Sequence, residues 1–203
     1  DGSGSYIENP GSHGYLNAGD YTVKLIADAD NGCADTSTQI VTVARYPNKS
    51  ISVNGAVSFC EGGDVELSVD SSSGYLFQWK LNGTNITGGT SQVYTASSTG
   101  IYSTTIINSV GNCVTDSDEI SIEVKEAPEQ PFINYSGKLD FCQPDSLRLT
   151  VTDHPDYIYR WKNAGGTVGS DTSILMVKSS GTYSLEVINE NGCTDTSANT
   201  LQI

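Results

Sequence analysis

The same short pattern occurs three times in this 203-residue chain. Each copy pairs a Gly-x-Tyr segment with a cysteine ten to twelve residues further on, and the three segments are Gly19-Asp20-Tyr21, Gly100-Ile101-Tyr102 and Gly181-Thr182-Tyr183. We call the three cysteines trailing cysteines; they are Cys33, Cys113 and Cys193, at intervals of 80 residues. A repeat of this length restricts the chain to an array of similar small domains.

A second series occurs twice, 82 residues apart, and predicts the domain boundaries. Phe59-Cys60 matches Phe141-Cys142, and Trp79 matches Trp161. We call Cys60 and Cys142 leading cysteines. Pro47 and the stretch 126–131, which contains two prolines, read as linkers because proline interrupts strand pairing. The sequence therefore predicts a partial first repeat (1–46) followed by complete second (47–127) and third (128–203) repeats.

Within each complete repeat, apolar residues alternate with polar ones. Val65, Leu67 and Val69 are separated by Glu66 and Ser68, and the third repeat has Leu147, Leu149 and Val151 in the same arrangement. Period-two alternation predicts half-buried strands. About seven short strands in some 80 residues fit an antiparallel two-sheet sandwich. The sequence therefore predicts an all-β protein, with a meander barrel as the alternative.

Two aromatic residues give each complete repeat a resemblance to an immunoglobulin-like (Ig-like) domain. Trp79 and Trp161 take the place of the buried Trp of strand C, and Tyr102 and Tyr183 that of the tyrosine corner. Antibody domains have a cysteine two residues after this tyrosine, where the present chain has Thr104 and Leu185. The resemblance implies tandem Ig-like sandwiches in which packing replaces the central disulfide.

The first repeat resembles the C-terminal half of a polycystic-kidney-disease (PKD) domain. Two of the motifs of that family are matched, by Asn9-Pro10-Gly11-Ser12-His13-Gly14-Tyr15 and by Ala18-Gly19-Asp20-Tyr21-Thr22-Val23. The combination of PKD and Ig-like repeats is similar to the large surface adhesins of Bacteroidetes, which leave the cell by type IX secretion and in some cases serve gliding motility. The resemblance implies a partial PKD-type β-sandwich at the N-terminus.

The first repeat holds only about three predicted strands, too few to bury a core. Its apolar stripe, which includes Tyr21, Val23, Leu25 and Ile40, is expected to be exposed. We expect the remaining half of this domain to be another chain, or to have been lost to disorder or proteolysis.

Charge and composition exclude several classes of function. The net charge of -14 argues against binding nucleic acid, and no apolar run is long enough for a membrane span. The two histidines, His13 and His154, do not lie in a pattern with a serine or cysteine nucleophile, and the cysteines are too far apart for a zinc site. The sequence predicts that the chain is not an enzyme and needs no cofactor.

Acidic residues near the predicted turns raise one metal hypothesis. Asp28, Asp30, Asp116 and Asp118 are weak candidates for calcium ligands at the hinges between domains. The competing interpretation is a solvated acidic surface with turn-forming aspartates.

The cysteines allow three arrangements. Pairing within each repeat, Cys60 with Cys113 and Cys142 with Cys193, is favoured because the two cysteines occur together in each complete repeat. The sandwich topology argues against it, because the leading and trailing cysteines are expected at opposite ends of a strand of about 20 Å, whereas a disulfide needs Cα atoms within about 7 Å. Two other arrangements remain possible: a bridge between repeats, from Cys60 to Cys193, and free thiols throughout.

These features predict a non-catalytic rod or stalk segment of a secreted or cell-surface bacterial adhesin. Its partners would be neighbouring domains of a longer chain, and a surface polysaccharide or another surface protein. The alternative is an accessory polysaccharide-binding module of a secreted enzyme, with a binding face formed by Tyr75, Tyr94, Tyr157 and Tyr159. An exposed row of aromatic residues would favour this module, and buried aromatic residues would favour the rod.

Overall fold

The computed structural model describes residues 2–142 and 145–203, in which all regular secondary structure is β-strand. The chain divides into two compact units. The N-terminal unit contains Asp1–Val57 and Asp64–Ile122, and the C-terminal unit contains Ser58–Gly63 and Glu123–Ile203. The segment 58–63, which belongs to the second repeat by sequence, is therefore part of the C-terminal unit. The three-domain division at 46/47 and 127/128 stays a prediction from the repeats.

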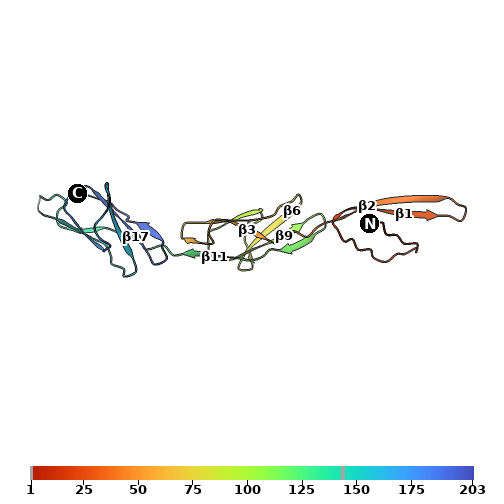
Figure 1. Cartoon of the computed structure of the whole chain (residues 1–203), viewed down its shortest axis with the longest axis horizontal. Coiled ribbons are helices and arrows are strands. Elements are labelled where there is room, and N and C mark those ends of the chain that lie inside the picture. Colours follow the sequence, from red (N-terminus) through yellow and green to blue (C-terminus); the bar gives the residue numbers. More distant parts are fainter. Residues whose placement is uncertain (1, 143–144) are drawn as a thin grey trace. The chain divides into compact units, whose positions relative to one another are not determined.

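The N-terminal unit contains a hairpin and most of a two-sheet sandwich. The hairpin pairs β1 (Gly19–Asp28) with β2 (Ala34–Val43) as a separate two-stranded sheet (Figure 1). One sheet of the sandwich has the order β3 (Ile51–Asn54), β5 (Val65–Val69), β8 (Val93–Ala96). The other contains β7 (Thr84–Asn85), β6 (Tyr75–Leu81), β9 (Gly100–Asn108) and β11 (Ile120–Lys125), with β10 (Cys113–Asp116) also on β9.

The C-terminal unit repeats this arrangement. One sheet has the order β12 (Asn134–Ser136), β13 (Leu147–Thr150), β16 (Ile174–Val177). The other has the order β15 (Gly166–Val168), β14 (Ile158–Asn163), β17 (Thr182–Ile188), β18 (Thr194–Thr196), with β19 (Leu201–Gln202) also on β17. In the second repeat the sheet of β3, β5 and β8 faces the sheet of β6, β9 and β11. In the third repeat the sheet of β12, β13 and β16 faces the sheet of β14, β17 and β19. This division of the strands between two sheets is that of an Ig-like sandwich.

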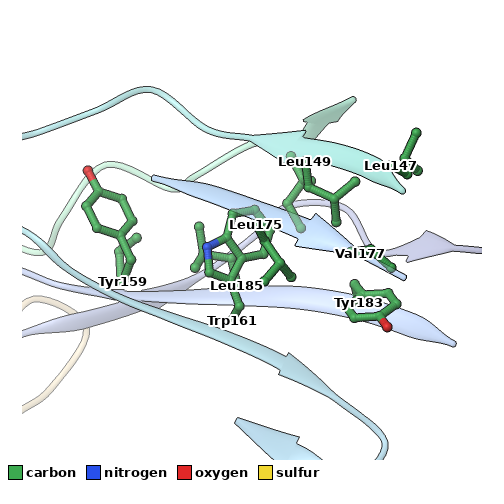
Figure 2. Packing of buried hydrophobic residues seen from close by; sticks show 10 residues of the cluster. Leu147, Leu149, Tyr159, Trp161, Leu175, Val177, Tyr183 and Leu185 are labelled. Carbon is green, nitrogen blue, oxygen red and sulfur yellow. The ribbon is translucent and has the colours of Figure 1, made fainter. Parts of the chain in front are cut away.

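The predicted strand residues form the two cores. Trp79 and Trp161 are completely buried, as the sequence predicts, and their Nε1 atoms donate to the carbonyl oxygens of Ser91 and Thr172, each at 2.9 Å. Figure 2 shows the ring of Trp161 in the core, with Leu149 of β13 and Leu175 of β16 from the facing sheet and Leu185 of β17 beside it in its own sheet. The central disulfide of antibody domains is replaced by packing, since the residues paired with the two tryptophans, Thr104 and Leu185, are themselves fully buried.

A tyrosine corner recurs in all three repeats. The Tyr102 hydroxyl donates to the carbonyl of Ser98 four residues earlier, at 3.0 Å, and Tyr183 donates to Ser179 at the same distance. Tyr21 makes the corresponding bond to Asn17 at 2.8 Å. The glycine two residues before each tyrosine has a φ of 151 to 155°, a backbone conformation that other residues rarely adopt, which explains the repeated Gly-x-Tyr.

Two buried tyrosines, the corner residue Tyr102 and the core residue Tyr159, are expected to make stability depend on alkaline pH. Burial raises the pKa of Tyr102, and it also raises the pKa of Tyr159. The unfolded chain then loses these protons first, so the free energy of unfolding should be constant up to about pH 10 and fall as the pH rises through the raised pKa values. In denaturant titrations, Tyr102→Phe should cost about 1 kcal/mol at pH 7 through the lost hydrogen bond, and the double variant with Tyr159→Phe should show a smaller alkaline decline. The control is Tyr6→Phe, at an exposed position.

The hairpin differs from its predicted form in two ways. The described residues of the first repeat form two strands instead of about three. Val23, Leu25 and Ile40 are exposed, as expected, whereas Tyr21 is half-buried. Ile40 does not share a face with the others, because it pairs with Thr22, and paired residues of an antiparallel ladder point to the same side.

Candidate functional site

The candidate functional site is a disulfide that joins two repeats. Cys60 bonds to Cys193 with a Cα–Cα distance of 5.6 Å, and the two residues are 133 positions apart. The favoured within-repeat pairing is therefore wrong, and the between-repeat bridge that the sequence left open is the one formed. Cys113 and Cys142, expected to be half-cystines, are free thiols together with Cys33.

A short parallel strand brings Cys60 to this position. β4 (Ser58–Cys60) pairs in parallel with the end of β11, with Phe59 opposite Val124 and Cys60 opposite Lys125. The amide of Glu61 continues the pairing by donating to the carbonyl of Lys125 at 2.9 Å. All these residues belong to the C-terminal unit, which also contains Cys193. The parallel pairing therefore brings the leading cysteine of the second repeat to the trailing cysteine of the third.

An asparagine holds the other half of the disulfide. The side-chain oxygen of Asn189 accepts from the Cys193 amide at 3.0 Å, and its amide nitrogen donates to the carbonyl of Glu126 at 2.8 Å. Cys193 is only 1% exposed. Asn189 therefore ties the turn that carries Cys193 to the linker beside β4. Asn189 is not among the residues predicted from the sequence, although an asparagine stands near each trailing cysteine.

The N-terminal unit has a closely similar arrangement without the disulfide. Asn108 donates to the carbonyl of Arg45 at 3.0 Å, as Asn189 does to Glu126. Arg45 and Glu126 each stand two residues before a buried proline. The Sγ of Cys113 lies 3.9 Å from the carbonyl oxygen of Ala44, in the same linker. The turn packs closely there, because a Cβ added to Gly111 would lie 2.8 Å from the Ala44 Cβ.

The calcium candidates do not come together. Asp116 accepts from the Thr105 hydroxyl at 2.6 Å and from Lys80 at 3.0 Å; the Thr105 hydrogen bond, followed by that from Lys80, lowers its pKa. Asp118 forms an ion pair with Lys49 at 2.9 Å. Within residues 2–142 and 145–203, no group of three or more His, Cys, Asp or Glu side chains is arranged to hold a metal ion. Calcium binding therefore stays a prediction from the sequence.

The two histidines lie in separate surroundings. His13 contacts the Tyr15 ring edge-on, with ring centroids 4.8 Å apart. His154 stacks on Tyr157 and lies 3.9 Å from a carboxylate oxygen of Glu129, at a pocket of about 120 Å³ in the C-terminal unit. None of the residues lining this pocket is a serine or cysteine.

Comparisons with known proteins give similarity at the level of structure. No protein-family model matches the chain, and no curated protein matches it. A chain from the complex of the mouse coronavirus receptor-binding domain with its murine receptor matches 75% of this chain over 98% of its own length, with 16% identity and a TM-score of 0.39. An intimin fragment in complex with the intimin-binding domain of the translocated intimin receptor matches 75% over 62%, with 16% identity and a TM-score of 0.36. An I-band fragment of titin matches 78% over 66%, with 16% identity and a TM-score of 0.32.

The described residues include no helix with the length and apolar character needed to cross a membrane.

Three features identify the fold: the strand order, the two buried tryptophans and the tyrosine corners. The chain is an all-β protein built of tandem immunoglobulin-like sandwiches.

Proposed function

We propose that the chain is a non-catalytic, tension-bearing stalk segment of a large secreted or cell-surface bacterial adhesin. The observation that carries this proposal is the bond between Cys60 and Cys193. It joins the second and third repeats at a place other than the backbone linker. A segment under tension gains a second covalent path from such a bond.

The second covalent path determines which residues bear a force applied to the ends of the chain. The two cysteines are 133 positions apart, so 132 residues lie between them. A force applied to the two ends of the chain runs from residue 1 to Cys60, crosses the disulfide and continues from Cys193 to residue 203. The residues between the cysteines, which include both buried tryptophans, stay outside this path.

Pulling single molecules by their two ends tests the proposal. At about 3.5 Å per extended residue, the 132 shielded residues correspond to roughly 460 Å of chain. The oxidised protein should therefore reach a fully extended length roughly 460 Å shorter than the protein in reductant. Cys60→Ser should show the long extension without reductant, and the matched control, Cys142→Ser at an exposed free thiol, should keep the short one. Equal extension with and without reductant would remove the basis of the stalk proposal.

The disulfide also fits an oxidising, extracellular location, which the stalk function requires. Structural disulfides persist outside the cell and are rare in the reducing cytosol. The net charge of -14 agrees with partners other than nucleic acid, namely neighbouring repeats and surface molecules. The resemblance to Bacteroidetes repeat adhesins motivates the finer assignment to a type IX-exported surface protein with a PKD-type first repeat.

The polysaccharide-binding alternative requires exposed aromatic rings. Of its four candidate tyrosines, Tyr159 is buried and Tyr94 lies between Trp79 and Tyr102, with ring centroids 5.7 and 5.9 Å away. Tyr157 stacks on His154. These contacts support the stalk over the binding module. A glycan array separates the two, since only the binding module should bind a polysaccharide through these four tyrosines.

A further inference from the structure

The free edge of β2 resembles the place where β4 and the Cys60–Cys193 bond meet the end of β11, but within residues 2–142 and 145–203 no strand equivalent to β4 lies on it. In the C-terminal unit, Glu123–Lys125 has β4 as its parallel partner. Counted from the linker carbonyls that an asparagine holds, those of Arg45 and Glu126, the corresponding residues of the first repeat are 42–44, 81 positions earlier. The ladders differ by two residues, since Val43 pairs with Gly19 whereas Ile122 pairs with Gly100. Among the described residues, β2 pairs only with β1, so the edge beside residues 42–44 has no strand on it.

A cysteine already stands beside this edge. Cys113 corresponds to Cys193, and its Sγ lies 3.9 Å from the carbonyl oxygen of Ala44. Ala44 corresponds to Lys125, the residue opposite Cys60 in the parallel pairing. A strand added to β2 in the same register would therefore place its cysteine opposite Ala44, next to the free thiol of Cys113.

In both places an asparagine side chain donates a hydrogen bond to a carbonyl oxygen of the linker that precedes the repeat. Asn108 fixes the Arg45 carbonyl at 3.0 Å, as Asn189 fixes the Glu126 carbonyl at 2.8 Å. Cys113 is partly exposed, whereas Cys193 with its partner in place is 1% exposed. This difference is expected for a joint whose incoming strand is absent.

We propose that the edge of β2 at residues 42–44 is a docking site for a Ser-Phe-Cys strand from another repeat of this kind, which adds in parallel and forms a disulfide with Cys113. The two thiols give up two protons and two electrons to a disulfide oxidant such as oxidised glutathione, which is reduced to two thiols. The proposal rests on the internal repetition of the joint and not on the stalk role, so the pulling experiment can fail while docking succeeds.

The test uses the intact chain and a synthetic peptide with the sequence of residues 56–64, Ala-Val-Ser-Phe-Cys-Glu-Gly-Gly-Asp. The peptide cysteine is activated as a disulfide with 2-thiopyridine. The Cys113 thiolate attacks the peptide sulfur, the bond to the thiopyridine breaks, and pyridine-2-thione leaves with the electron pair. The reference probe is a peptide of the same composition with the residues around the activated cysteine scrambled.

Peptide mapping by mass spectrometry gives the rate at each cysteine. Cys113 should react at least about tenfold faster with the native peptide than with the scrambled one, a preference of the size that a few strand hydrogen bonds supply. Cys33, an exposed thiol without this arrangement, should react with both at one rate. Asn108→Ala, which releases the linker, should remove the preference while the thiol stays reactive. Equal rates at Cys113, or no reaction there with either peptide, would overturn the proposal.

Discussion

Replacing Trp79 or Trp161 with alanine is expected to lower the free energy of unfolding by about 3 to 5 kcal/mol. Both side chains are completely buried, and each indole also donates to a carbonyl oxygen just before a strand of the facing sheet, that of Ser91 before β8 or that of Thr172 before β16. The substitution removes the largest apolar contact of the core, leaves a cavity and strips that carbonyl of its donor. A loss of this size is comparable with the whole stability of many domains, so the affected sandwich should be largely unfolded.

Denaturant titration followed by circular dichroism measures this loss, and the remaining tryptophan reports by fluorescence on the other sandwich. Leu76→Ala and Ile158→Ala are matched controls, because these residues lie on the same strands as the tryptophans and are exposed. Both should change stability by about 0.5 kcal/mol or less. A loss below about 1 kcal/mol for either tryptophan would contradict a role for its ring as the centre of the core.

Breaking the bond between Cys60 and Cys193 is the second large effect. The bond closes a loop over a separation of 133 residues, for which the loop-entropy relation gives about 5 kcal/mol of stabilisation. Cys60→Ser and Cys193→Ser should each lose this amount. The double variant should lose no more than either single one, because both substitutions remove the same bond.

The control for this prediction is the pair Cys33→Ser and Cys142→Ser, which change exposed free thiols and should leave the midpoint of unfolding unchanged. Reductant should lower the midpoint of the native chain to that of Cys60→Ser. An unchanged midpoint in Cys193→Ser would mean that the bond does not constrain the unfolded chain.

Much of each sandwich core could be predicted from local patterns. Alternation placed Val65, Leu67 and Val69 on one buried face, and all three are at most 3% exposed. The repeated tryptophan and Gly-x-Tyr identified the third strand and the tyrosine corner, where Tyr102 bonds to a residue only four positions away. These features depend on strand period and on contacts within a few residues, which the order of the amino acids states directly.

The faces of the hairpin show where such patterns end. Counting along one strand places Tyr21, Val23 and Leu25 together, but it does not say which residue of β2 stands opposite them. The register pairs Ile40 with Thr22, so Ile40 lies on the other face. A shift of one residue in register would reverse this result, because side chains alternate with a period of two.

The sequence by itself determined an all-β chain of Ig-like repeats, their two tryptophan-centred cores and the set of cysteines available for pairing. Only the tertiary structure decided which cysteines meet. Cys60 leaves the core of its own repeat because β4 pairs in parallel with the end of β11, and Asn189 holds Cys193 at the linker that follows. The physical reason is distance: a disulfide forms where two Cα atoms come within about 7 Å, and residues 133 positions apart acquire that proximity only through the packing of the folded chain.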